Sequence, residues 1–258
     1  MYIIVSKAGN DMQSLDRAMM IIKIFMQRDS NEFLSITELS KECDLPFSSM
    51  HRILKAMIKH RMIEQDKERK LYGLGTLWLE YGLITYDTVD YVSVVRPELD
   101  KLMRKVEESV YLTKPLEMES LIIERIDCEK NIIRIHDQLG LRLPMNVGAA
   151  NIAMLAFMSP NQKENIIKGL EIEEEREKLE EVLEKVKKDG YKASHEERLE
   201  GITSVATPIF NHFGEVQGAV SAGLTNFNLT EDKLNFVIQE ILKTGRIISR
   251  KMGYQYNQ

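Results

Sequence analysis

Four cations and two histidines gather between Pro46 and Ile63, a stretch that contains no acidic residue. The cations are Arg52, Lys55, Lys59 and Arg61, and the histidines are His51 and His60. All of these cations but Arg61, together with Ser48, fall within one narrow arc of a helix at about 100° per residue. A guanidinium matches the two acceptors of guanine, and both kinds of cation bind phosphate. On a lone helix such an arc is an ordinary solvated face. Whether this helix binds DNA must therefore be judged from the segments that surround it in the sequence.

A second group of residues could hold a small molecule. Two expected strands carry small and hydroxylated residues, namely Thr203, Ser204 and Thr207 on one and Ala219, Ser221, Ala222 and Gly223 on the other. Small side chains leave space beside a sheet, and hydroxyls can donate to a carboxylate or a carbonyl. A helix that starts at residues 148–150 would add free backbone N–H groups that suit an anion. The residues alone fit a pocket and close helix–sheet packing equally well.

The histidines form no recognisable catalytic motif. None of the five stands in HExxH, and the chain has no GxSxG elbow, P-loop or GxGxxG. Ser194-His195-Glu196 has the residue types of a triad, but adjacent residues cannot face one another as a triad requires. We expect His195 to lie on the surface or at a helix start. Neither His136-Asp137 nor His212 has partners at metal-ligand spacing, so we expect no catalytic residue, no metal and no cofactor.

The segments around the basic stretch have the order of a winged helix-turn-helix. A helix is expected from about Ser14, as its N-cap, to Met26. The next begins at Ser35, where Ser-Ile-Thr-Glu matches the capping box, and ends near residues 43–44. A third helix starts with Pro46 and runs to about His60. Residues 62–65 and 71–74 then read as two short strands, and the polar residues 66–70 between them make a wing with a basic tip.

Apolar spacing predicts which faces of these helices are buried. In the third helix the predicted core positions are Met50, Ile53, Leu54, Met57 and Ile58. The first helix has one stripe formed by Leu15, Ala18, Met19, Ile22 and Met26, and a second apolar surface formed by Met20, Ile21 and Ile24. A helix that is apolar most of the way round needs a second partner, which we expect to be another subunit.

The rest of the chain mixes helices and strands. Residues 77–84 form an apolar connecting helix that contains Trp78 as a packing anchor, and Pro97 marks a start or a kink in the helix after it. Strands are expected at 110–113, 121–126 and 132–136, and a hairpin is expected from 201–210 and 216–224. Helices are expected at 148–158, after the Ser159-Pro160 cap, over the Glu- and Lys-rich residues 171–188, and from Thr230 to about Met252. This mixture predicts an α+β domain.

Composition restricts the class of protein. The chain has 258 residues, a net charge of −5 and a sequence pI of about 5.7, which argue against general coating of DNA. Residues 1–75 have a small positive net charge, and the rest of the chain has a negative net charge. The two cysteines, Cys43 and Cys128, lie far apart and form no disulfide framework. With no membrane span and no signal peptide in the sequence, we expect a cytoplasmic protein.

Several motifs together resemble the isocitrate lyase regulator (IclR) family of transcription factors. In the first half they are SLDRAMMIIKIF, SITELSKECDLPFSSMHRILKAMIKHRMIEQD and KLYGLGTLWLEYG. In the second half they are GLRLPMNVGAANIAMLAF and GYKASHEERLEGITSVATPIFNHFGEVQGAVSAG. The resemblance covers roughly Ser14 to Met252 and is loose only over 109–134. It implies a profilin-like or GAF-like α+β effector-binding domain after the winged helix-turn-helix.

The resemblance also implies a ligand site. Its contacts would lie at Gly148, Ala149, Ser194, Ile202, Ser204, Ser221 and Gly223, with a small organic acid or aromatic compound as the effector. The sequence departs from the family at two of these positions, because some members have an acidic residue at Ser194 and a cysteine at Ser204. The usual glycine of the small-residue helix is Asn151 here. The chemistry of the ligand is therefore expected to differ from that of these members.

We predict three parts: residues 1–75 as the winged helix-turn-helix, 76–90 as a linker helix and 91–258 as the effector-binding domain. The predicted function is a sequence-specific regulator of transcription, a repressor, that binds a pseudo-palindromic operator on double-stranded DNA as a homodimer or a tetramer. The predicted DNA contacts are Ser48, Ser49, His51, Arg52, Lys55, Lys59, Lys67, Arg69 and Lys70. The alternatives are a winged helix that acts through protein contacts and a small-molecule enzyme of the sensor-domain fold.

Overall fold

The chain divides into two compact units, Met1–Val89 and Asp90–Gln258. The computed structural model describes residues 13–26, 28, 32–87, 90–129, 137–169 and 173–256. Each unit has its own hydrophobic core, so the two are described separately.

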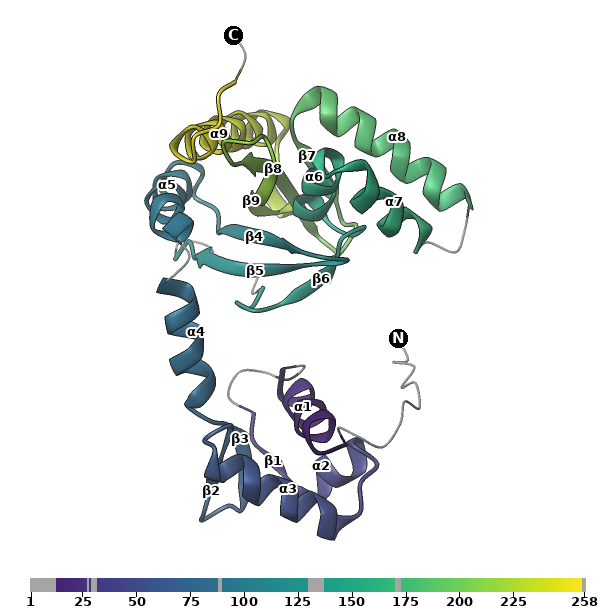
Figure 1. Ribbon diagram of the computed structural model, residues 1–258. Coiled ribbons are helices and arrows are strands. Elements are labelled where there is room, and N and C mark those ends of the chain that lie inside the picture. The colour runs from purple at the N-terminus through teal and green to yellow at the C-terminus, as the bar shows by residue number, and fades with distance from the viewer. Residues whose placement is uncertain are drawn as a thin grey trace. The chain divides into compact units, whose positions relative to one another are not determined.

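The first unit holds a helix-turn-helix followed by a wing (Figure 1). Its elements are α1 (Gln13–Met26), β1 (Leu34–Ser35), α2 (Ile36–Glu42), α3 (Phe47–Lys59), β2 (Ile63–Asp66), β3 (Leu71–Leu74) and α4 (Leu77–Asp87). The three short strands pair antiparallel in the order β1-β3-β2. The predicted winged helix-turn-helix is confirmed, and β1 adds a strand that the sequence pattern did not indicate.

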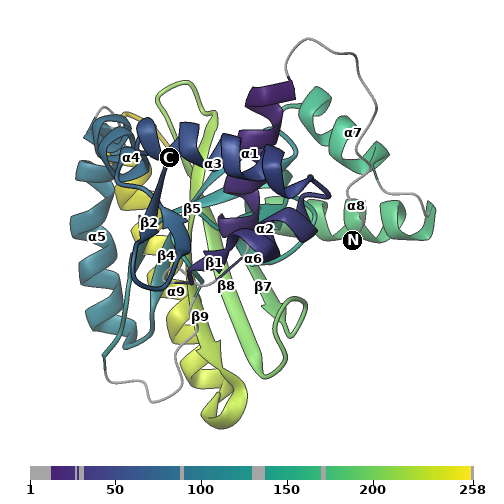
Figure 2. The ribbon, with the colours of Figure 1, turned by 90° about the horizontal axis from the view of Figure 1, so that it is seen from below.

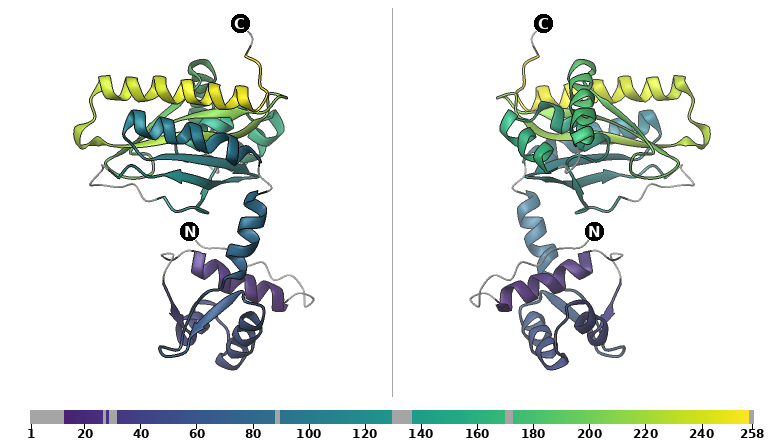
Figure 3. Two further views of the ribbon diagram at one scale, coloured as in Figure 1. Left: turned by 90° about the vertical axis from the view of Figure 1, so that its left-hand side faces the viewer. Right: turned by 90° about the vertical axis from the view of Figure 1, so that its right-hand side faces the viewer.

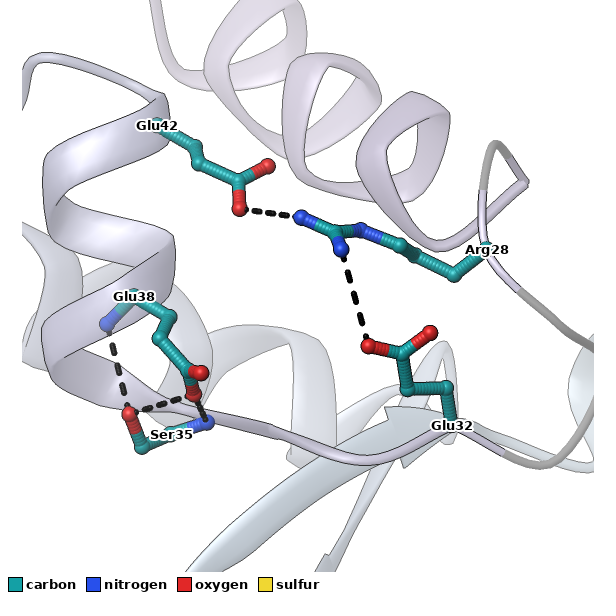
Figure 4. Close-up of polar contacts among 5 residues, drawn as sticks. All are labelled: Arg28, Glu32, Ser35, Glu38 and Glu42. Carbon is teal, nitrogen blue, oxygen red and sulfur yellow. Dashed lines mark hydrogen bonds and ion pairs between the residues drawn. The ribbon is translucent and has the colours of Figure 1, made fainter.

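Local hydrogen bonds fix the start of α2, as Figure 4 shows. Ser35 Oγ accepts from the Glu38 backbone N–H at 3.3 Å, and Glu38 Oε2 accepts from the Ser35 N–H at 2.7 Å. The predicted capping box is therefore confirmed, and the hydrogen bonds from Ser35 lower the pKa of Glu38. Arg28, which follows α1 in the chain, forms an ion pair with Glu42 of α2, in which Arg28 Nη2 lies 2.6 Å from Glu42 Oε1. The predicted N-cap at Ser14 is wrong, because α1 already includes Gln13.

The core of the first unit forms where α1, α2 and α3 meet. Met50, Leu54 and Met57 of α3 are buried as predicted, whereas Ile53 is half-buried and Ile58 is exposed. The prediction for Ile58 is wrong, because this residue lies in the last turn of α3 with its side chain exposed. The apolar stripe of α1 was also misplaced. Its buried side chains are Ala18, Ile21, Ile22, Ile24 and Phe25, while Leu15, Met19 and Met26 are exposed.

The second unit is a six-stranded antiparallel sheet with helices on both faces, an α+β arrangement (Figures 1 and 2). Its strands are β4 (Val110–Leu116), β5 (Glu119–Ile126), β6 (Arg142–Pro144), β7 (Lys192–His195), β8 (Ile202–Phe210) and β9 (Val216–Thr225). Its helices are α5 (Asp90–Val106), α6 (Ala149–Phe157), α7 (Pro160–Lys168), α8 (Glu173–Asp189), η1 (Asn226–Asn228) and α9 (Glu231–Lys251). The strand order is β6-β5-β4-β9-β8-β7.

Two cores flank this sheet. On one face α5 and α9 lie side by side (Figure 3), and the buried residues include Leu99, Val205, Ile209 and Ile241. On the other face α6 packs on β8 and β9, and α8 covers α6. The Glu- and Lys-rich helix α8 is thus only partly solvated, because Leu179, Leu183 and Val186 are buried against the neighbouring elements.

Most of the elements predicted for this half are confirmed, with a few corrections. Thr230 caps α9, and Ser159 forms a capping box at the start of α7. Gly148 is the N-cap of α6 and not its first residue. Pro97 lies inside α5. The strand β6 was not predicted, and the strand predicted at 132–136 lies outside the described residues.

Candidate DNA-binding surface and ligand cavity

The predicted DNA contacts lie on one helix and the wing of the first unit. On α3, Ser48, His51, Arg52, Lys55 and Lys59 are exposed, and Ser49 is half-buried. In the wing, Lys67, Arg69 and Lys70 are exposed. The buried residues of α3 leave the polar arc free, so the cations lie where a DNA duplex can reach them.

A tight turn sets the direction of α3. Ser40 Oγ donates a hydrogen bond to the carbonyl of Leu45, and the Leu45 N–H donates to the carbonyl of Ser40. Between them Asp44 adopts a left-handed conformation with φ of 49°. Asp tolerates this conformation better than most residues, which suits the sharp reversal between two helices. The start of α3 is consequently fixed against the end of α2.

The wing tip is closed by Asp66. Its Oδ1 accepts from the backbone N–H groups of Glu68 at 2.9 Å and Arg69 at 3.0 Å. Arg69 Nε also lies 3.7 Å from Asp66 Oδ2, which partly offsets its charge. Lys67 and Lys70 are therefore the stronger candidates for phosphate contacts in the wing.

Two exposed residues on this surface were not among the predicted contacts. Phe47, the first residue of α3, is 55% exposed, and Arg61 follows the end of the helix with φ of 57°. A bulky aromatic at the N-terminus of a recognition helix can contact a thymine methyl. In the sequence, the position of Phe47 directly after the Leu45-Pro46 turn was the signal that could have indicated this contact.

The helix α4 is attached firmly to the end of α3. Trp78 Nε1 donates to the carbonyl of Met62 at 2.6 Å, and the Leu77 N–H donates to the carbonyl of Arg61 at 3.2 Å. Trp78 also packs against the core of the first unit, as predicted for an anchor. Farther along, Leu79, Leu83 and Ile84 are each about 60% exposed. The helix thus continues from the DNA-binding elements and presents apolar side chains without cover in this unit.

The residues predicted to hold a ligand surround a single cavity in the second unit. Gly148, Ala149, Ser194, Ile202, Ser204, Ser221 and Gly223 all line it. The centre of a water molecule can occupy about 50 Å³ of this cavity, and the space free of atoms is about 620 Å³ when the open mouth is included. From the sequence, a ligand pocket and close packing of a helix on the sheet were equal alternatives. In the structure these residues line a pocket.

Strand register explains how the wall of the cavity forms. Ser194 pairs with Ser204, and Ser204 pairs with Gly223, so the three lie in one row across β7, β8 and β9. In the next row Ser221 pairs with both Ala206 and Tyr111. Because side chains alternate along a strand, the residues next to Ser204 point to the other face.

Two hydroxyls assigned to this wall from sequence therefore lie elsewhere. Thr203 donates to Asn226 Oδ1 at 2.7 Å, and Thr207 donates to the carbonyl of Gly190 at 2.9 Å. Neither lines the cavity. Side chains alternate between the two faces along β8, so both threonines lie on the face opposite to that of Ser204. Grouping the small residues by sequence alone did not separate the two faces.

The N-terminus of α6 forms another part of the cavity wall. Gly148 has φ of 86°, a left-handed conformation that suits glycine, and no side chain caps the helix. The first N–H groups of a helix have no partner within it. Those of Ala149 and Ala150 belong to this first turn, and an anion in the cavity would meet them and the positive end of the helix dipole.

Charged and phenolic residues that the sequence did not single out complete the lining. Arg198, after β7, forms an ion pair with Asp137, before β6, although the two are far apart in the chain. Arg125 Nη1 donates to the Asp137 carbonyl at 3.0 Å. Tyr111 is buried in the wall, and burial, followed by the charges of Asp137 and Asp127, raises the pKa of its phenol, which stays a neutral donor.

No group of three metal-binding side chains occurs among the described residues. His195 lies exposed in β7, with Nδ1 3.0 Å from Thr203 Oγ1, so it is a surface residue and does not start a helix. His136 lies outside the described residues. Cys43 and Cys128 are buried and free, and burial raises the pKa of the Cys43 thiol to about 11.

Comparison with known proteins identifies the two units. Residues 14–67 match the IclR helix-turn-helix domain, and residues 85–250 match the C-terminal domain of bacterial IclR transcriptional regulators. The chain belongs to the IclR family of bacterial transcriptional regulators. This IclR-family protein is thus a helix-turn-helix regulator of transcription, with its DNA-binding motif in the first unit and an effector-binding domain in the second.

Similar proteins span nearly the whole IclR-family chain. The transcriptional regulator KipR of Bacillus subtilis is 26% identical, over 95% of this chain and 99% of its own. The transcriptional repressor AllR of Escherichia coli K12 is 25% identical, over 93% and 90%. The crystal structure of an IclR homologue from Microbacterium hydrocarbonoxydans, complexed with 4-hydroxybenzoate, aligns with a TM-score of 0.78, 20% identity and coverage of 93% and 98%. Among the described residues, no helix is long and apolar enough to cross a membrane.

Proposed function

We propose that this IclR-family protein is a cytoplasmic repressor that binds a pseudo-palindromic operator as a homodimer and changes its affinity when a small carboxylate enters the cavity. The observation that carries the effector part is the cavity, where hydroxyls, free helix N–H groups and Arg198 converge. AllR, which covers nearly the same length, is named a repressor, and this supports the direction of control.

The exposed arc of α3 supports sequence-specific reading. Near its N-terminus, Ser48, Ser49 and Arg52 would approach base edges, and Arg52 would make a bidentate contact with guanine. His51 next to Arg52, Lys55 and Lys59 farther along α3, and Lys67, Arg69 and Lys70 of the wing would meet phosphates and fix the register. Two subunits would place their α3 helices in successive major grooves, about 34 Å apart.

Exposed apolar side chains support the proposed dimer. Leu15, Met19 and Met26 of α1 and Leu79, Leu83 and Ile84 of α4 are exposed in a single chain. Exposed apolar surface often marks a site where another protein binds. Pairing through α1 and α4 would cover them and set the separation of the two α3 helices.

The mechanism follows from the attachment of α4 to the end of α3. Because Trp78 and Leu77 hold α4 to Met62 and Arg61, a change in α4 would move the recognition helix with it. A bound effector alters DNA affinity only if it binds one arrangement of the dimer better than the other.

Fluorescence anisotropy with the gene's own upstream DNA and with scrambled DNA, over a range of salt concentrations, tests the proposal. We expect binding to the upstream DNA to be at least about a thousandfold tighter. Equal, weak and steeply salt-dependent binding to both DNAs would contradict it and would favour a winged helix used for protein contacts.

A further inference from the structure

Phe47 is an exposed aromatic residue at the start of the recognition helix. It is the first residue of α3, and it is 55% exposed. It lies neither in the described hydrophobic core of the first unit nor among the side chains packed against that core. A phenylalanine ring that stays in water gives up the favourable free energy of burial. The packing of this unit therefore gives no reason for an aromatic ring at this position.

The backbone holds Phe47 in a fixed place at the end of the helix. The preceding Pro46 has a restricted φ, and its carbonyl accepts from the Met50 N–H at 3.0 Å, which closes the first turn of α3. The hydrogen bonds between Leu45 and Ser40 attach this turn to α2. Each Cα–Cβ bond of a helix tilts toward its N-terminus, so a side chain on the first residue extends beyond the helix end. In a helix-turn-helix this end enters the major groove.

The chemistry of the major groove limits what such a ring can contact there. The other exposed residues in the first turns of α3 are polar, namely Ser48, His51 and Arg52. They suit the hydrogen-bond donors and acceptors of the base edges, whereas the 5-methyl group of thymine is apolar. A ring placed over a donor or an acceptor would remove its water and replace no hydrogen bond, which costs free energy. A ring placed over a methyl group removes apolar surface of both partners from water.

We infer that Phe47 recognises a thymine in each half of the operator by packing against its 5-methyl group. Arg52 lies five residues farther along α3, which corresponds to about 7.5 Å along the helix axis and roughly two base pairs of DNA. The thymine should therefore lie close to the guanine that Arg52 contacts. This inference rests on the proposed operator binding and adds a second base to what the helix reads.

Replacing thymine by uracil tests the inference, because it removes the methyl group and keeps the base pairing. The gene's own upstream DNA is amplified once with dTTP and once with dUTP, and binding of the full chain to each is measured by fluorescence anisotropy. One buried methyl group corresponds to about a fourfold change in affinity. We expect the wild type to bind the uracil DNA about fourfold more weakly for each half-site, or roughly fifteenfold for a dimer on both.

Variants of α3 assign the effect to one side chain. Phe47→Ala should bind the thymine DNA more weakly than the wild type does and should bind both DNAs with affinities that agree within about twofold, because the ring that contacts the methyl group is gone. Phe47→Leu retains an apolar side chain and should keep part of the preference. Ile58→Ala is the matched control, since Ile58 is an exposed apolar residue at the other end of the same helix, and it should keep the full preference. Calorimetry should show unfolding of Phe47→Ala at the temperature of the wild type, because Phe47 lies outside the core.

Single substitutions in a synthetic operator then locate the contact. Uracil is placed at one thymine of each half-site at a time, and Arg52→Ala with base-substituted operators identifies the guanine. We expect the sensitive thymine within about three base pairs of that guanine. A sensitive thymine more than about five base pairs away would contradict the contact, since Phe47 and Arg52 lie on the same short helix.

The remaining outcomes also decide the matter. Equal binding of thymine and uracil DNA by the wild type would overturn the inference. So would a preference that survives Phe47→Ala, because the methyl groups would then act through the shape of the DNA or through another residue. Loss of the preference in Ile58→Ala as well would have the same meaning. A protein that prefers its upstream DNA to scrambled DNA but does not distinguish uracil from thymine keeps the proposed function and loses only this contact. Failure to distinguish upstream from scrambled DNA would remove both.

Discussion

The DNA-binding surface takes its residues from one helix and the hairpin that follows it, whereas the cavity draws its lining from all six strands of the sheet, from α6 and from the loops beside them. On α3 each cation is exposed. In the cavity the lining residues come from strand rows, a helix end and loops that are far apart in the chain, so their positions depend on long-range pairing.

The two regions should therefore respond differently to substitutions. A change on the exposed arc of α3 should alter DNA affinity and leave the fold intact. A change in the cavity wall should alter the shape of the site. A side chain added where two backbone segments lie in close contact should lower the stability only of the unit that contains them.

The strongest test of independent units is Gly75→Ala. A Cβ at this position would lie 2.1 Å from the carbonyl oxygen of Arg61, so the junction between α3, the wing and α4 must shift. We expect a loss of about 3 kcal/mol from the first unit, the upper end of the usual cost of overpacking. Calorimetry should show one lowered transition with the second unit unchanged.

A matched control lies in the same unit. Gly82→Ala, in the middle of α4, adds a methyl group with no atom within 4 Å in the described structure. It should be neutral or stabilise α4 by about 0.5–1 kcal/mol, because alanine favours a helix. Equal destabilisation by both variants, or lowering of both transitions by Gly75→Ala, would contradict the assignment of the close contact to this unit alone.

Arg52→Ala tests the reading surface. Losing a bidentate guanine contact should weaken operator binding by about 1–3 kcal/mol, or roughly five- to 150-fold, and relax the base preference at that position. Anisotropy with a set of operator variants measures both effects. Arg246→Ala, on the exposed side of α9, should leave affinity unchanged. Unaltered operator binding by Arg52→Ala would remove α3 as the recognition helix.

Ser204→Phe tests the cavity. Because Ser204 lies in the middle of the row formed with Ser194 and Gly223, an aromatic ring there should fill the space and weaken effector binding at least tenfold. DNA affinity without effector should stay within about twofold of the wild type. The same aromatic placed in the β8–β9 turn, His212→Phe, should leave both unchanged. A normal ligand response from Ser204→Phe would place the effector site elsewhere.

How far sequence could predict these sites depends on the range of the contacts. The arc of α3 follows from the spacing of Met50, Leu54 and Met57, which are neighbours on one helix, and Ser35 shows its capping box within four residues. The error at Ile58 arose because the periodicity of a helix does not reveal where its covering neighbours end. Local patterns therefore predict local structure well and its edges less well.

The cavity could be predicted only in part, for the same reason. Resemblance to the family located the residues that line it, but the composition of β8 did not separate Ser204 from Thr203 and Thr207, which point the other way. Nothing local links Arg198 to Asp137, because the two meet only after the sheet has brought their loops together.

The ion pair between Arg198 and Asp137 allows a last, smaller test of the cavity. Asp137 holds a guanidinium beside the N-terminus of α6, so it competes with an anionic ligand for the same charge. Asp137→Asn should leave Arg198 to the ligand and tighten binding of glycolate and acetate alike, by about two- to fivefold, in keeping with the modest free energy of a partly solvated pair. Calorimetric titration measures the change. Glu119→Gln, which removes the acid of the exposed pair with Arg142 outside the cavity, should have no effect. Weaker binding by Asp137→Asn would mean that Asp137 positions Arg198 for the ligand, and the two residues would then act as one binding unit instead of as competitors.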